Sequence, residues 1–246
     1  MSTVLPRPHP LAHRPTLKSL VQRLHALSLE QEQANKLRGV HFPSTITSKP
    51  GDDGFEDQLV ALDEDKAGFV YGVLRAMGAT RVVEAGTSYG VSLLWLLAAV
   101  SDTLASSPPS ASSSPSSRPP LVIGTEKEPE KVKKALAHVD EGFEGQTPEY
   151  LRVLEGDLLQ TLPEAGLEDG SIDALLLDIW APLTLPVLKT LLPKLRRGAA
   201  VFVDNTVSSE VRYKDLLDFI RADGSGFTSV LVPFSCGFDL CIYNGK

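Results

Sequence analysis

The sequence predicts an α/β fold with a seven-stranded sheet, helices on both faces and a helical extension at the N-terminus. Short apolar runs alternate with helical segments between residues 81 and 222, which is typical of a doubly wound parallel sheet. Two further apolar runs, Ser229–Pro233 and Phe238–Tyr243, are joined by a short link at 234–237 and must therefore form an antiparallel hairpin. Five alternating strands and this hairpin make seven strands, with the last strand antiparallel.

The expected elements begin with an amphipathic helix over 16–38, where leucines recur at helical spacing. This helix could serve as a lid, a homodimer contact or ordinary packing. A second helix is expected over 55–77, ending at Gly78. The later expected elements are strands at 81–85, 121–125, 151–155, 173–178 and 199–204, and helices at 90–100, 128–139, 184–195 and 209–222.

Length and composition favour one large α/β domain. We assign 1–54 to an N-terminal extension and 55–246 to the main domain of the 246-residue chain. The net charge of −7 argues against a nucleic-acid partner, because neutralising phosphates requires clustered Lys and Arg. The chain has no apolar run of about 20 residues, so no membrane span is expected, and the default localisation is cytoplasmic. The two cysteines, Cys236 and Cys241, are expected to be reduced thiols.

A Ser/Pro-rich segment at 101–120 interrupts the alternating region. It contains too few apolar residues to pack a core, and we expect a disordered surface loop. Such a helix-to-strand loop lies at the edge of a parallel sheet opposite to the edge that binds ligands.

Two glycines follow the first strand of the alternating region, in the stretch VVEAGTSYGVS (82–92). Gly86 and Gly90 would let the backbone approach a ligand closely, and the following helix presents its positive N-terminus there. The spacing differs from the G-x-G-x-x-G pattern of dinucleotide-binding folds, which makes a pyrophosphate site less probable. A nucleoside-like ligand fits this turn.

Two acidic residues end neighbouring strands near this turn. Glu126 stands where an acid can accept hydrogen bonds from both ribose hydroxyls, although a solvated residue at a helix start is the simpler alternative. Glu84 ends an apolar strand and should be partly buried, which is costly without a donor or a cationic partner. A ligand ammonium or an internal hydrogen bond would supply that partner.

Five stretches together resemble the S-adenosylmethionine-dependent O-methyltransferases that include the catechol and caffeoyl-CoA enzymes. They are VVEAGTSYGVS, VIGTEKEPE, VLEGDLLQTLPE, LLLDIW and FVDN, and the resemblance covers residues 60–245. It implies a Rossmann-like methyltransferase sheet whose last strand is antiparallel. The residues that it implies for cofactor binding are Asp63, Glu84, Gly86, Ser88, Gly90, Ser92, Glu126, Asp157, Asp178 and Trp180.

The resemblance also implies a metal site and a catalytic centre at Asp178, Asp204 and Asn205, which end neighbouring strands. Hard oxygen ligands of this kind suit Mg²⁺, which would stabilise the phenolate of an acceptor and orient its oxygen. The alternative is that Asp178 only orients the cofactor, while Asp204 and Asn205 cap the next helix.

Two departures from the family pattern concern the acceptor. The family's general-base lysine is replaced by Ala181, and the proline after FVDN is replaced by Thr206. His41, Tyr213 and Lys214 are the substitute bases that the sequence offers. The pocket for the acceptor is therefore expected to differ from that of the catechol enzymes.

The leading hypothesis is a metal-assisted methyltransferase that uses S-adenosylmethionine and Mg²⁺ to modify a hydroxyl of a small phenolic or catechol-like acceptor. One alternative is a metal-independent N- or S-methyltransferase, for which the missing lysine is no obstacle. Another is a non-catalytic protein that binds S-adenosylmethionine or a nucleoside.

Overall fold

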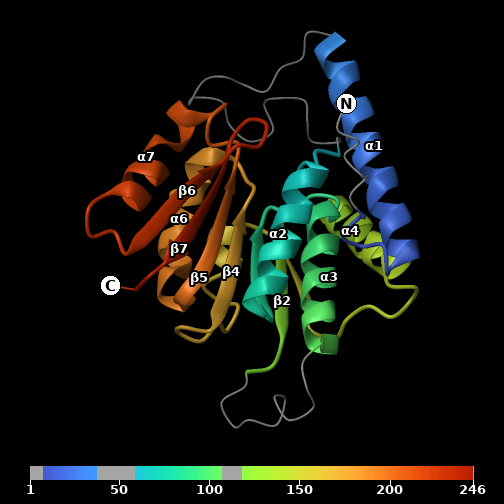
Figure 1. Cartoon of the computed structure of the whole chain (residues 1–246), viewed down its shortest axis with the longest axis horizontal. Coiled ribbons are helices and arrows are strands. Elements are labelled where there is room, and N and C mark those ends of the chain that lie inside the picture. The colour runs from blue at the N-terminus through green and yellow to red at the C-terminus, as the bar shows by residue number, and fades with distance from the viewer. Residues whose placement is uncertain (1–7, 38–58, 107–117, 246) are drawn as a thin grey trace, which may run out of the picture.

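The computed structural model describes residues 8–37, 59–106 and 118–245 (Figure 1). The helices are α1 (Pro15–Leu37), α2 (Glu64–Met77), α3 (Val91–Ser106), α4 (Pro129–Gly142), α5 (Leu158–Thr161), α6 (Ala181–Leu191) and α7 (Glu210–Arg221), with the 3₁₀ turn η1 (Leu192–Lys194). The strands are β1 (Arg81–Ala85), β2 (Leu121–Glu126), β3 (Leu151–Glu155), β4 (Ile172–Leu177), β5 (Leu195–Asp204), β6 (Phe227–Val232) and β7 (Phe238–Tyr243).

The seven strands form one sheet in the order β3-β2-β1-β4-β5-β7-β6. The first five strands are mutually parallel, and β7 runs antiparallel to both of its neighbours, β5 and β6. The predicted α/β fold class, the number of strands and the antiparallel last strand are confirmed. Strands β1 and β4 are neighbours at the centre of the sheet, and the order of the strands along the chain reverses between them. The carboxyl ends of the strands at such a reversal are the usual ligand site of parallel sheets.

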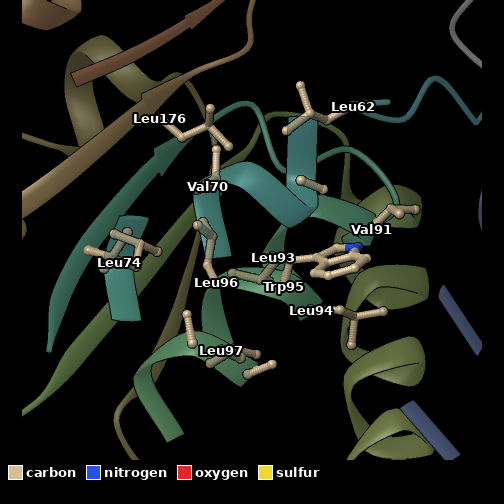
Figure 2. Packing of buried hydrophobic residues seen from close by; sticks show 14 of the residues in the cluster. Leu62, Val70, Leu74, Val91, Leu93, Leu94, Trp95, Leu96, Leu97 and Leu176 are labelled. Carbon is tan, nitrogen blue, oxygen red and sulfur yellow. The ribbon is translucent and has the colours of Figure 1, made fainter. Parts of the chain in front are cut away.

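Two apolar clusters cover the two faces of the sheet. One joins α1, α2 and α3 to side chains such as Leu176 and Phe202, and the other joins α6 and α7 to side chains such as Leu175 and Val201. Figure 2 shows Val70 and Leu74 of α2 in the first cluster, together with Leu93, Leu94, Leu96 and Leu97 of α3. The alternation of faces along β4 and β5 follows from the two-residue period of a strand.

Helix α1 packs its apolar side into the first cluster. Leu17, Leu20, Val21 and Leu24 are buried there. Of the uses that the sequence left open for this helix, packing against the core is the one observed. Within the described ranges, none of the helices combines the length and the apolar character needed to cross a bilayer.

The second helix is shorter than predicted. Residues 59–63 are not helical, and α2 begins at Glu64 after Asp63, while 55–58 lie outside the described residues. Its predicted end is confirmed, because Gly78 caps it in the left-handed conformation with φ of 62°.

Helix α3 is longer than predicted. It continues to Ser106, so the first six residues of the segment expected to be disordered, 101–106, are helical. Asp102 anchors this end, because its carboxylate accepts hydrogen bonds from Arg14, His13 and Tyr71. Residues 107–117 of the expected loop lie outside the described residues.

Smaller differences concern element ends. The helix expected at 184–195 is α6 followed by η1, and β5 begins at Leu195 rather than at 199. Strand β6 begins at Phe227 rather than at 229, and the short helix α5 was not predicted.

Candidate functional site at the carboxyl edge of the sheet

The carboxyl ends of β1, β2, β4 and β5 bring four acidic side chains to one edge of the sheet. Glu84 and Glu126 lie in β1 and β2, Asp178 directly follows β4, and Asp204 ends β5. Strand β4 pairs with β1 on one side and β5 on the other, and Leu177 is in register with both Ala85 and Val203. The expectation that these residues end neighbouring strands is confirmed.

The two glycines of the turn after β1 make close approaches to the protein itself. Gly86 has φ of 92°, and a Cβ atom there would lie 2.3 Å from the carbonyl oxygen of Asp178. Gly90 has φ of 85°, and its Cβ would lie 2.9 Å from the Cβ of Ala135 in α4. The atoms nearest to these two Cβ positions belong to the segment that directly follows β4 and to α4, so packing within the protein already requires both glycines, and the approach of a ligand to this turn stays a prediction. The turn is tight because the segment after β4 and helix α4 both pack directly against it.

Glu84 is completely buried within this turn. Its Oε2 atom accepts a hydrogen bond from the Thr87 hydroxyl at 2.6 Å, while Oε1 has no partner among the described residues. Burial raises the pKa of Glu84 to about 7, although the hydroxyls of Ser92 and Thr87 oppose the rise. A buried carboxylate with one free oxygen suits a cationic ligand group.

Glu126 is held by two backbone amides. Its Oε2 atom accepts from the Ser88 N–H at 2.8 Å, and Oε1 accepts from the Glu128 N–H at 2.9 Å. The carboxylate therefore ties the glycine turn, where Ser88 has φ of 47°, to the end of β2. Each carboxylate oxygen can accept a further hydrogen bond, so this fixed group can also face a pair of hydroxyls.

Two more of the residues implied for cofactor binding follow β3 and β4. Asp157 is exposed and caps α5, accepting a hydrogen bond from the Leu159 N–H at 2.9 Å. Trp180 is partly buried and directly precedes α6. Both lie after strands that end at this edge of the sheet.

Asp204 is surrounded by donors. Its Oδ1 atom accepts from the Asn205 backbone N–H at 2.8 Å, and Oδ2 accepts from the Asn205 side-chain amide at 3.0 Å. Asn205 takes the left-handed conformation, with φ of 61°. Burial raises the pKa of Asp204, and burial together with the charge of Asp204 raises that of Asp178 well above its ordinary value.

A lysine that the sequence analysis missed lies against these carboxylates. Lys66, in the first turn of α2, places its Nζ atom 2.7 Å from Asp204 Oδ1 and 2.9 Å from Asp63 Oδ2. Burial lowers the pKa of Lys66, but the charges and hydrogen bonds of Asp204 and Asp63 outweigh it and leave the pKa raised. Lys66 is therefore a buried ammonium paired with one buried and one partly exposed carboxylate.

The spacing of apolar residues in α2 indicates from the sequence alone that Lys66 is buried. Lys66 lies four and eight residues before Val70 and Leu74, so it falls on the buried stripe of the helix. A lysine at such a position needs an anionic partner from another element.

The predicted metal ligands consequently face an ammonium group. Across the described parts of the chain, no three His, Cys, Asp or Glu side chains are grouped to hold a metal ion. Both oxygens of Asp204 already accept hydrogen bonds, and one of them also contacts the ammonium group of Lys66. A divalent ion does not fit this donor set unless Lys66 moves away.

The substitute bases differ in position. Tyr213 is buried beside Ile179, and burial together with Asp178 and Asp204 raises its pKa, which disfavours a role as base at neutral pH. Lys214 is exposed, and its ammonium group is paired with Asp218 on the same helix. His41 lies outside the described residues.

Several solved structures share this fold. Cofactor-bound Rv0187 from MTB superposes with a TM-score of 0.64 at 18% identity, covering 98% of this chain and 100% of that chain. The O-methyltransferase TomG from Streptomyces achromogenes, in complex with SAM, gives 0.58 at 18% identity with coverages of 99% and 93%. An O-methyltransferase from Bacillus cereus in complex with SAH gives 0.57 at 14% identity with coverages of 98% and 93%.

Sequence comparison supplies the family. Curated protein sequences yield no match. The family described as a methyltransferase domain matches residues 83–206, half of the 246-residue chain. This segment begins within β1 and contains β2 to β5, the glycine turn and all four acidic strand ends. The chain therefore belongs to the methyltransferase-domain family.

Proposed function

We propose that the protein binds S-adenosylmethionine at the carboxyl edge of its sheet and transfers the methyl group to a hydroxyl of a small molecule. The buried carboxylate of Glu84 beside the glycine turn is the observation that carries the proposal, because its free oxygen can receive the ammonium of the methionine part. Similar folds in TomG and in the Bacillus cereus protein are O-methyltransferases with SAM or SAH bound.

The other assignments follow from placement along the same edge. Gly86, Ser88, Gly90 and Ser92 would surround the methionine part, and Glu126 would face the ribose hydroxyls. Asp157 and Trp180 would flank the adenine, while Asp63 and Asp178 would lie nearer to the transferred methyl group. In the reaction, the methyl group leaves the sulfonium sulfur and bonds to the acceptor oxygen, and the hydroxyl proton is released.

Transfer of radiolabelled methyl from S-adenosylmethionine to a panel of phenols, catechols and aliphatic alcohols tests the proposal directly. We expect a methylated ether and S-adenosylhomocysteine in equal amounts. Calorimetry that detects no S-adenosylmethionine binding would reject the proposal at its first step.

The first prediction concerns the ribose contact. Glu126→Ala should weaken S-adenosylmethionine binding by about 10- to 100-fold, because a charge-assisted hydrogen-bonding partner worth roughly 1.5–3 kcal/mol is lost. Isothermal calorimetry measures the change, and thermal unfolding without ligand shows whether the variant folds. Glu155→Ala is the matched control: Glu155 pairs with Glu126 across the β2–β3 ladder, but its side chain is exposed. Equal losses of S-adenosylmethionine affinity in the two variants would show that Glu126 does not bind the ribose.

The second prediction concerns the pH dependence that Glu84 imposes. Its pKa rises from an ordinary value of 4.5 to about 7 on folding. Its contribution to stability is therefore complete below pH 4.5 and is lost as the pH rises through about 7. Ligand-free wild-type protein should thus lose stability over this interval relative to Glu84→Gln, as urea unfolding at several pH values would measure.

Ligand binding should show the opposite trend. Because an ammonium group binds the ionised carboxylate, S-adenosylmethionine affinity should rise by up to about tenfold per pH unit below the pKa and level off above it. Glu84→Gln should bind more weakly and lack this slope. If the wild-type affinity for S-adenosylmethionine stays constant between about pH 5 and 7, Glu84 does not bind the ammonium group of the ligand.

A second candidate is transfer to nitrogen or sulfur without a metal, which the Lys66–Asp204 pair favours over the metal-assisted form. These nucleophiles need less activation than a phenol, whose pKa is about 10. Amine and thiol acceptors in the same panel distinguish the two. For the metal-assisted form, Asp178, Asp204 and Asn205 would have to hold the Mg²⁺, whose chemistry is to stabilise an acceptor oxyanion.

A further inference from the structure

The sheet edge holds an internal cation where the sequence predicts a divalent ion. The Lys66 side chain is 1% exposed, and its Nζ atom contacts the carboxylates of Asp204 and Asp63 at 2.7 and 2.9 Å. Helix α2 delivers the lysine from a part of the chain 138 residues away from Asp204. The contact is therefore a tertiary feature built by packing α2 against the sheet.

The neighbouring carboxylates would otherwise repel one another. Asp178 lies next to Asp204 across the β4–β5 pairing, where the preceding residues Leu177 and Val203 are in register. Lys66 thus places a positive charge in contact with Asp204 and Asp63, at the strand end that Asp178 shares, as a bound cation would.

A divalent ion and this ammonium cannot occupy the same place. Mg²⁺ binds carboxylate oxygens at about 2.0–2.1 Å. An ion on Asp204 at that distance would lie within a few ångströms of Lys66 Nζ, with no water between them to weaken their repulsion. Asp204 also accepts two hydrogen bonds from Asn205, so the amide nitrogen of Asn205, and not its amide oxygen, faces the Asp204 carboxylate.

We propose that Lys66 takes the place of the divalent metal at this edge of the sheet, so that the protein folds and binds its ligands without one. Positive charge beside Asp178 and Asp204 is then a permanent part of the chain. The exclusion of the metal by Lys66 does not rest on the proposed function.

The test measures metal binding without cofactor or acceptor. Wild-type protein, stripped with EDTA and dialysed, should show no saturable Mn²⁺ or Mg²⁺ binding by calorimetry and no rise in melting temperature. Lys66→Met keeps most of the side-chain volume and removes the charge, leaving Asp63, Asp178 and Asp204 without their cation. This variant should gain Mn²⁺ binding, with a rise of about 5–10 °C in melting temperature at roughly a hundredfold excess over the dissociation constant.

A surface lysine provides the matched control. Lys133 is exposed on α4, and Lys133→Met should respond to Mn²⁺ as the wild-type protein does. Saturable Mn²⁺ binding by the wild-type protein overturns the proposal, as does a folded Lys66→Met variant that gains no response. If Lys66→Met fails to fold, the wild-type calorimetry decides alone.

A separate measurement addresses the catalytic consequence. Methyl transfer by the wild-type protein should be the same in EDTA and in Mg²⁺. Absence of any transfer would count against the proposed function and leave the binding result standing, whereas transfer that EDTA abolishes would count against the replacement of the metal by Lys66.

Discussion

Asp204→Ala is expected to lower the free energy of unfolding by about 3–5 kcal/mol, because the buried ammonium of Lys66 loses its buried partner. Asp63 remains within reach of Lys66, but its side chain is 39% exposed, so water screens much of its attraction. The backbone N–H and the side-chain amide of Asn205 would also lose the carboxylate that accepts their hydrogen bonds. Urea unfolding near neutral pH measures the loss.

Two variants control this experiment. Asp63→Ala removes the exposed partner of the same lysine and should cost only about 1 kcal/mol or less. Adding Lys66→Met to Asp204→Ala should recover part of the lost stability, because no uncompensated charge then remains. If Asp204→Ala lowers the free energy of unfolding no more than Asp63→Ala does, the Lys66–Asp204 ion pair contributes little to stability. In that case the Lys66 ammonium must reach solvent when Asp204 is removed.

Gly86→Ala is expected to destabilise the protein by about 3 kcal/mol or more. The residue has φ of 92°, and the added Cβ would lie 2.3 Å from the Asp178 carbonyl oxygen and 2.5 Å from Ile179 Cγ2. A left-handed backbone alone costs a residue with a side chain about 1–3 kcal/mol. The Asp178 N–H also donates to the carbonyl of Ala85, so relieving the contact would pull the end of β4 away from β1.

Gly72→Ala is the matched control for this substitution. Gly72 is exposed in α2, and a Cβ there would meet nothing within 4 Å. Alanine in a helix interior is favoured over glycine by about 0.5–1 kcal/mol, so this variant should be slightly more stable than wild type. Thermal unfolding compares the two. A Gly86→Ala variant that melts together with wild type would mean that the turn after β1 can open without cost.

The sheet could be predicted from the sequence because its strands are short, apolar and separated by helices. Mostly buried strands such as β1 (RVVEA) and β4 (IDALLL) consist mainly of apolar residues, and turn residues bound them. The family membership inferred from five ordered stretches is confirmed by the match over 83–206. The acidic residues that end these strands were located for the same reason, since each directly follows an apolar run.

The contacts that cross the molecule could not be predicted in this way. Nothing local links Lys66 to Asp204, and only packing α2 onto the sheet brings them together. The same holds for Asp102, which was assigned to a disordered segment because of the Ser and Pro residues around it. Its partners Arg14 and Tyr71 come from elements that sequence spacing cannot place next to it.

The position of β7 also constrains the order in which the sheet can be completed. During synthesis β6 emerges before β7, yet β7 lies between β6 and β5 and forms hydrogen bonds with both. A nascent chain interrupted after residue 237 would leave β5 with an unpaired edge and β6 with no neighbour. An open edge of this kind is a template for pairing with other chains. The three strands beyond β4 are therefore protected from aggregation only after β7 has left the ribosome, and incomplete chains should be preferred substrates for chaperones.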